Sequence, residues 1–182
     1  MIKVLDTKIN KKGEPLNYFY MERFSYPSAV KAGVSAECET SFIMEFFKKQ
    51  GKIEIFQKKK TKVDLVYFPR SNSYGVSQKF KDIFENKLKA EFFKTTIDGY
   101  YLMVVNNVVD CVDKEKTQII YIFPDRRCAY KRPAIIIFDE NMVENELLFS
   151  IPEQPLKTFC TEKFMKMCEE YNITNVIFRD FK

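Results

Sequence analysis

The feature that most constrains the fold of this 182-residue chain is a segment that occurs twice. Residues 76–94 read VSQKFKDIFENKLKAEFFK and residues 160–178 read CTEKFMKMCEEYNITNVIF, and the two align without a gap at an offset of 84. The identical pairs are Lys79/Lys163, Phe80/Phe164 and Glu85/Glu169. Each copy is typical of a capped amphipathic helix that leads into a short strand.

Both copies carry the same helical signals. Ser77 and Thr161 are small polar residues placed to cap the two helices. The apolar positions that follow fall on one helical face, which we expect to be buried against a sheet. These stripes are Phe80, Ile83, Phe84 and Leu88 in the first copy, and Phe164, Met167, Cys168 and Tyr171 in the second. Phe92-Phe93 aligns with Val176-Ile177 as the closing strand of each unit.

Strand signals dominate the rest of the chain. Glu91–Ile97 and Tyr100–Val105 flank Asp98-Gly99, which predicts a hairpin with a type I′ turn. Ser35–Lys49 has a helical pattern. Other predicted strands are Ile53–Phe56, Val63–Phe68, Gln118–Phe123, Ala134–Phe138 and Leu147–Ile151. We predict one α+β domain over residues 1–182, with a substantially antiparallel sheet on which two similar helix-strand cassettes pack.

Composition narrows the class of protein. With 46% hydrophobic and 15% aromatic residues, the chain is long enough to bury a core and is not disordered. It contains neither an apolar run long enough for a signal peptide nor one that would span a membrane, so we expect a cytoplasmic protein with no membrane contact. Its five cysteines are odd in number and form no C-x-x-C pair, which favours reduced, packed thiols.

The absence of histidine lowers the expectation of enzymatic chemistry. It excludes Ser-His-Asp and Cys-His catalytic sites and zinc sites with histidine ligands. Asp110 and Asp113 could be paired carboxylates, but without a third ligand they are better explained as turn residues between strands. We therefore predict a protein that is not an enzyme, with no catalytic residues, metal or cofactor.

Charge is distributed unevenly along the chain. Residues 48–89 contain 12 basic and 4 acidic residues, whereas residues 139–170 contain 3 basic and 8 acidic residues. A candidate basic patch, with Tyr130 available for stacking, comprises Lys58, Lys59, Lys60, Lys62, Arg126, Arg127, Lys131 and Arg132. The plainer interpretation of these residues is two solvated loops. A candidate acidic surface for a protein partner comprises Glu140, Glu144, Glu146 and Glu153.

The order of these segments resembles a known family. A strand is followed by VSQKFKDIF, EFF and DGYYLMVVNNVVDCVDKEKT, and later by FSIP, FCTEKFMKMCEE and NVIF. This order is similar to that of the immunity-protein family numbered eleven, with its neighbour numbered forty-three, from bacterial polymorphic toxin systems. Residues 63–181 carry the resemblance. Residues 1–62 form an extension of the same domain whose role the sequence does not define.

The resemblance implies a cytoplasmic protein that neutralises a cognate toxin by occluding it, in the setting of competition between bacteria. The identity of the toxin, the contact residues and the oligomeric state do not follow from the sequence. A small basic nucleic-acid-binding module is the alternative, although the lack of a recognisable motif disfavours a nucleic-acid partner. An enzyme using carboxylate or lysine chemistry is a weaker third hypothesis.

Overall fold

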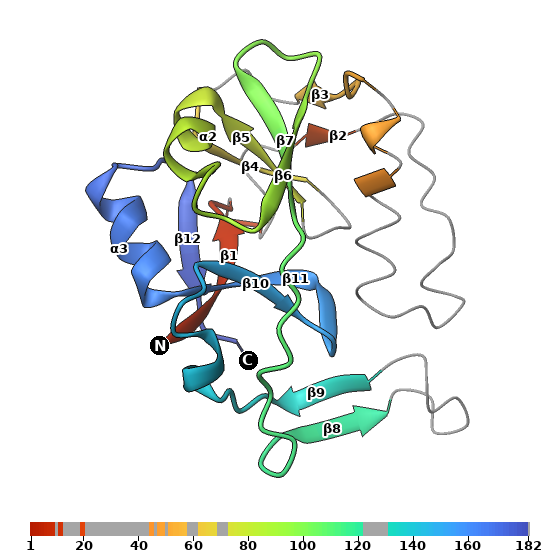
Figure 1. The fold of residues 1–182 in the computed structure, drawn as a ribbon, viewed down its shortest axis with the longest axis vertical. Helices are drawn as coiled ribbons and strands as arrows, with labels where there is room; N and C mark the ends of the chain where they lie inside the picture. The colour runs from red at the N-terminus through yellow and green to blue at the C-terminus, as the bar shows by residue number, and fades with distance from the viewer. Residues whose placement is uncertain are drawn as a thin grey trace.

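The computed structural model describes residues 1–9, 11–12, 19–20, 44–45, 47–49, 51–57, 62–68, 73–121 and 131–181 (Figure 1). Its helical elements are α2 (Gln78–Phe84), the 3-10 helix η2 (Glu140–Val143) and α3 (Glu162–Glu170). Its strands are β1 (Ile2–Thr7), β2 (Phe19–Tyr20), β3 (Phe56–Gln57), β4 (Leu65–Tyr67), β5 (Ser73–Ser77), β6 (Ala90–Lys94), β7 (Tyr100–Val105), β8 (Gln118–Tyr121), β9 (Lys131–Ile135), β10 (Leu148–Ile151), β11 (Gln154–Thr161) and β12 (Val176–Arg179).

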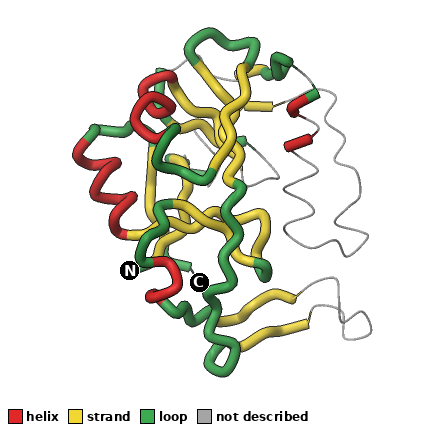
Figure 2. Tube along the Cα trace, viewed as in Figure 1, coloured by secondary structure: helices red, strands yellow, loops and turns green. Residues whose placement is uncertain are grey.

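Two four-stranded sheets organise the fold. Their strand orders are β4-β5-β7-β6 and β10-β11-β1-β12, and every pair of neighbouring strands in them is antiparallel. The pairs β2-β3 and β8-β9 are separate two-stranded sheets. Helices α2 and α3 lie together on one side of the molecule (Figures 1 and 2). The predicted α+β class with antiparallel pairing is confirmed, and the antiparallel strands are divided between two sheets.

The two sheets have the same plan. In the first, β5 leads through α2 to β6, and β7 lies between β5 and β6. In the second, β11 leads through α3 to β12, and β1 lies between them. The outer strands β4 and β10 pair in the same way with β5 and β11. The repeated sequence therefore marks two equivalent units, and the second unit takes its inner strand from the opposite end of the chain.

The strand registers extend this equivalence and correct the alignment. Ser77 pairs with Tyr100 as Thr161 pairs with Ile2, at the offset of 84. Beyond the helices the equivalent residues are Ala90 and Val176, at an offset of 86. The shift arises because α3 has nine residues and α2 has seven. The prediction that Phe92-Phe93 matches Val176-Ile177 was therefore wrong by two residues, and Phe92 corresponds to Phe178.

Each four-stranded sheet is buried on both faces. The central core contains matched residues of both units, including Leu65 with Leu148 and Phe80 with Phe164. A second core covers the other face of the β4-β5-β7-β6 sheet with Phe47, Ile53 and Ile55. A third core, comprising Cys111, Val112, Ile136, Val143, Phe149, Ile151 and Phe159, covers the other face of the β10-β11-β1-β12 sheet. Residues 109–112 and 136–143, which lie between the two repeats in sequence, supply the cover for that third core.

The two helices begin at the predicted residues but in different ways. Ser77 caps α2, since its hydroxyl accepts a hydrogen bond from the amide of Phe80 at 3.1 Å. Thr161 occupies the N-cap position of α3 and makes no side-chain cap bond. Its hydroxyl donates instead to the carbonyl of Glu146 at 2.7 Å. The capping prediction is confirmed for Ser77, whereas for Thr161 the hydroxyl joins the helix to the segment before β10.

Other local predictions are partly met. The β6-β7 hairpin is present, but the positive φ expected at both Asp98 and Gly99 occurs only at Gly99, so the turn is not type I′. Cys160 lies in β11 and not in the helix that contains Cys168. Most of the helix predicted over Ser35–Lys49 falls outside the described residues. Within that range, the described residues 44–45 and 47–48 are helical.

Candidate functional site: an acidic-rimmed hollow

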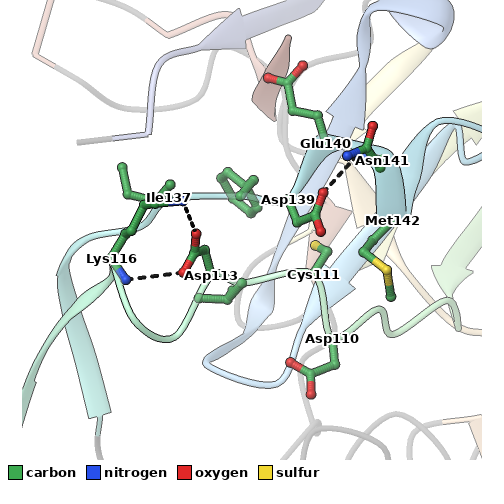
Figure 3. A pocket seen from close by; sticks show the side chains of 11 residues that line it. Asp110, Cys111, Asp113, Lys116, Ile137, Asp139, Glu140, Asn141 and Met142 are labelled. Atoms are coloured by element: carbon green, nitrogen blue, oxygen red, sulfur yellow. Dashed lines mark hydrogen bonds and ion pairs between the residues drawn. The ribbon is translucent and has the colours of Figure 1, made fainter.

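A hollow of about 600 Å³ lies at the end of the molecule that carries η2. Two segments line it, residues 110–113 with Lys116 on one side and residues 137–142 on the other (Figure 3). Its acidic residues are Asp110, Asp113, Asp139 and Glu140, and its exposed apolar side chains are Ile137 and Met142. Both segments belong to the part of the chain that lies between the two repeats.

Backbone pairing holds the two walls together. Val112 and Phe138 form an isolated antiparallel bridge. The amide of Asp113 donates to the carbonyl of Ile137, and the amide of Asp139 donates to the carbonyl of Cys111, both at 2.8 Å. Cys111, Val112 and Phe138 also belong to the third core, so the hollow has a rigid apolar base.

Asp113 and Asp110 act within the turn that connects β7 to β8. The Asp113 carboxylate accepts hydrogen bonds from Lys116 Nζ at 2.7 Å and from the amides of Glu115 and Lys116. The bond from Lys116 is the main reason that the pKa of Asp113 is lowered. Asp110 pairs with Lys114 at 2.8 Å, which raises the pKa of that lysine. The prediction of a turn residue is confirmed for Asp113, whose carboxylate bonds backbone amides of the turn at residues 114–116. Asp110 lies before that turn and bonds the side chain of Lys114.

The described thiols are buried and free. Burial raises the pKa of Cys111 and of Cys168 to about 12, and it also raises that of Cys160. A thiol with such a pKa remains protonated near neutral pH and is a poor nucleophile. Among the described residues, no group of three Cys, His, Asp or Glu side chains is placed to bind a metal ion. Cys38 and Cys128 lie outside the described residues.

Comparison with models of protein families identifies the family of the chain. The sequence model of the Immunity protein family (Imm11) matches residues 44–182, which cover both repeats and the hollow. The chain belongs to the Imm11 immunity protein family. Strand β1 precedes the matched region, although it completes the second sheet of this Imm11 protein. A search of curated proteins found no significant match to the sequence.

The four glutamates predicted as a partner surface have different surroundings in this Imm11 protein. Glu140 lines the hollow, is largely exposed and pairs with the amino terminus at 3.0 Å. Glu144 is exposed and follows η2. Glu146 is partly buried, pairs with Lys89 and accepts a hydrogen bond from Asn107 at 2.8 Å. One carboxylate oxygen of Glu153 is buried and accepts no hydrogen bond from any described residue.

The predicted basic patch falls mainly outside the described residues. Lys58, Lys59, Lys60, Arg126 and Arg127 are not described. Lys131 and Arg132 lie in β9, and their side chains are not described. Lys62 is exposed. The patch therefore stays a prediction.

Sequence reasoning did not assign several residues of the hollow to a site, among them Ile137, Asp139 and Met142. A local signal was present in the run AIIIFDENM at residues 134–142, where an apolar strand meets acidic residues. Ile135 and Ile137 are exposed, whereas Ile136 is buried in the third core.

In the part of the chain that the structure describes, no helix is long and apolar enough to cross a membrane.

Proposed function

We propose that this Imm11 protein is the cytoplasmic immunity partner of a bacterial polymorphic toxin. Membership of the immunity family, over residues 44–182, is the observation that carries the proposal. In this proposal the protein binds its cognate toxin tightly and occludes the active site or another surface that the toxin needs. Such occlusion requires a stable interface with a few buried anchors and no chemistry in the inhibitor.

The surroundings of the reactive groups support binding over catalysis. The described thiols are buried with raised pKa values, and the turn carboxylates Asp110 and Asp113 are paired with lysines. Burial of the thiols and pairing of the carboxylates are structural roles that require no catalytic function. Oligomeric state and stoichiometry are left to the experiment.

Co-expression tests the proposal directly. We expect the product of the gene adjacent to this one to arrest growth when expressed alone, and this protein to restore growth when present. The two should also be recovered together as a stable complex. If no adjacent product is neutralised, and the purified protein instead binds mixed RNA and DNA with strong salt dependence, the nucleic-acid alternative would replace this proposal.

A further inference from the structure

The hollow beside η2 is the surface best suited to hold part of a partner protein. We infer that it receives an apolar side chain of the toxin, flanked by lysine or arginine residues that meet the acidic rim. This inference rests on the proposed function and adds to it the place of contact and the chemistry of the toxin segment.

Exposed apolar side chains are concentrated at this end of the molecule. Met142, Ile135 and Ile137 are 57%, 52% and 38% exposed, and they are three of six large apolar residues that are exposed in the described part of the chain. Ile135 and Ile137 lie two residues apart in an extended segment, so they face the same side. An apolar group of this kind with a polar rim is typical of a protein-binding surface.

The charges around the hollow are available to a partner. Asp139 and Glu144 form no ion pair with any residue that the structure describes, although the Asp139 carboxylate accepts a hydrogen bond from the amide of Asn141 at 3.1 Å. Within the described ranges, Glu140 forms an ion pair with the amino terminus alone, and both groups are more than 60% exposed, which makes this a weak surface pair. A cationic segment could therefore pair with Glu140 and Glu144, and with Asp139 while it keeps its bond to Asn141, since a carboxylate accepts several hydrogen bonds. The nearby lysines, Lys114 and Lys116, are already paired with Asp110 and Asp113.

Placement within the fold favours the same surface. The repeated units have both sheet faces covered by cores, and their matched residues serve the scaffold. Residues 106–147 lie between the repeated units, and the residues that line the hollow all belong to this segment. Met142, Glu140 and Glu144 are exposed and lie outside the central core, so they can change without disturbing it, as matching to one particular toxin requires.

Charge reversal at exposed rim positions tests the inference. The double variant Glu140→Lys/Glu144→Lys should slow association with the adjacent gene's toxin at least tenfold at low salt and weaken its salt dependence. Met142→Ser should speed dissociation about tenfold, since it removes an apolar contact and leaves the charges unchanged. A matched control, Glu54→Lys/Glu170→Lys, makes the same charge change at exposed residues on other elements.

Thermal unfolding of each variant verifies that the fold is intact, and surface plasmon resonance gives the rates. If the rim double variant and Met142→Ser bind as the wild type does, or the control loses as much as the rim variant, the toxin docks elsewhere and the inference is wrong, while the proposed function stands. If the wild type itself forms no complex with the toxin, the proposed function fails and the inference falls with it.

Discussion

Asp64 joins the two repeated units through one carboxylate. It accepts hydrogen bonds from the hydroxyl of Ser77 at 2.7 Å, and from the amide and hydroxyl of Thr174 at 2.9 Å each. Ser77 belongs to the first unit, whereas Thr174 lies between α3 and β12 of the second. Lys79 adds a cation at 3.6 Å. Asp64 is itself buried, so few other groups could satisfy these donors.

These contacts determine how Asp64 responds to pH. Burial alone would raise its pKa, but the hydrogen bonds from Ser77 and Thr174 and the charge of Lys79 hold the pKa below its ordinary value of 3.8. The carboxylate therefore stabilises the fold at pH values above about 3.8. That contribution to the free energy of unfolding is lost as the pH falls from there through the lower pKa of the folded state.

We predict that Asp64→Asn lowers the free energy of unfolding by about 1–3 kcal/mol at neutral pH, because an amide group replaces an acceptor of several hydrogen bonds. The difference from the wild type should shrink as the pH falls below about 3.8. Urea unfolding at a series of pH values measures this. Asp98→Asn, at an exposed turn, is the control. A loss of stability that stays constant down to low pH would exclude the charged form as the stabilising species.

Paired asparagines provide a second link between the units. Asn175 donates to the carbonyl of Leu65 at 2.7 Å, and Asn107 donates to the carbonyl of Leu148 at 2.9 Å. Leu65 and Leu148 are equivalent residues in the edge strands β4 and β10. Each edge strand thus has one carbonyl that accepts from an asparagine outside its own unit, Asn175 just before β12 and Asn107 just after β7. These bonds leave fewer free backbone groups for pairing with other chains.

At the scale of the elements, equivalent helices begin with different hydrogen bonds. The α2 amide of Phe80 is bonded to Ser77, whereas the hydroxyl of Thr161 is directed to the carbonyl of Glu146. Two residues that align in sequence and occupy the same N-cap position therefore support different contacts. The Ser77 hydroxyl bonds both the first turn of α2 and the carboxylate of Asp64, whereas the Thr161 hydroxyl bonds the segment before β10.

This difference is measurable by amide hydrogen exchange. We predict that Ser77→Ala destabilises the protein by about 1–2 kcal/mol and speeds exchange at the Phe80 amide beyond the change shared by the β5 amides. Thr161→Val should leave the Phe164 amide no faster than the β11 amides around it. Selective acceleration at Phe164 would mean that Thr161 is a true side-chain cap in solution.

How far the sequence predicts these elements depends on burial. The helices were found because each has one buried face, which gives a clear helical period. Strand β1 was missed because Leu5 faces the central core while Ile2 and Val4 face the third core, so apolar residues occur on both sides of the strand. The same burial on two faces at Phe159 and Cys160 concealed β11.

The hollow could be predicted only in part. Asp139 and Glu140 belong to the acidic stretch 139–170 that the sequence shows, whereas Asp110 and Asp113 were interpreted as turn residues. The shape of the hollow depends on the bridge between Val112 and Phe138, which are 26 positions apart in sequence, and no local pattern specifies that register. Glu146 was grouped with the exposed glutamates because its pairing with Lys89 and Asn107 is equally long-range.

At the scale of the whole molecule, the scaffold and the proposed recognition surface occupy different parts of the chain. The repeated units supply the central core, and the segment between them supplies the cover of one sheet and the hollow. A substitution in the central core should therefore act on the toxin complex through folding, whereas one on the rim should act on the binding rates alone.

The ends of the chain lie side by side. Val4 pairs with Arg179 in neighbouring antiparallel strands, Lys3 forms an ion pair with Asp180, and both termini appear close together in Figure 1. The second unit is thus continuous in space and interrupted only in the order of the chain. A short peptide from Lys182 to Met1 would turn β12 and β1 into an ordinary hairpin.

We therefore predict that the protein tolerates circular permutation. A chain joined by a short Gly-Ser linker from Lys182 to Met1, and opened between Lys12 and Gly13, should unfold cooperatively within a few degrees of the wild type. Deleting residues 1–9 should abolish cooperative unfolding, because it removes the inner strand of a sheet and Leu5 from the central core. A stable deletion variant would refute this view. In the permuted chain the strands of the second sheet would be consecutive in sequence, and β1 would be synthesised directly after β12 instead of long before it.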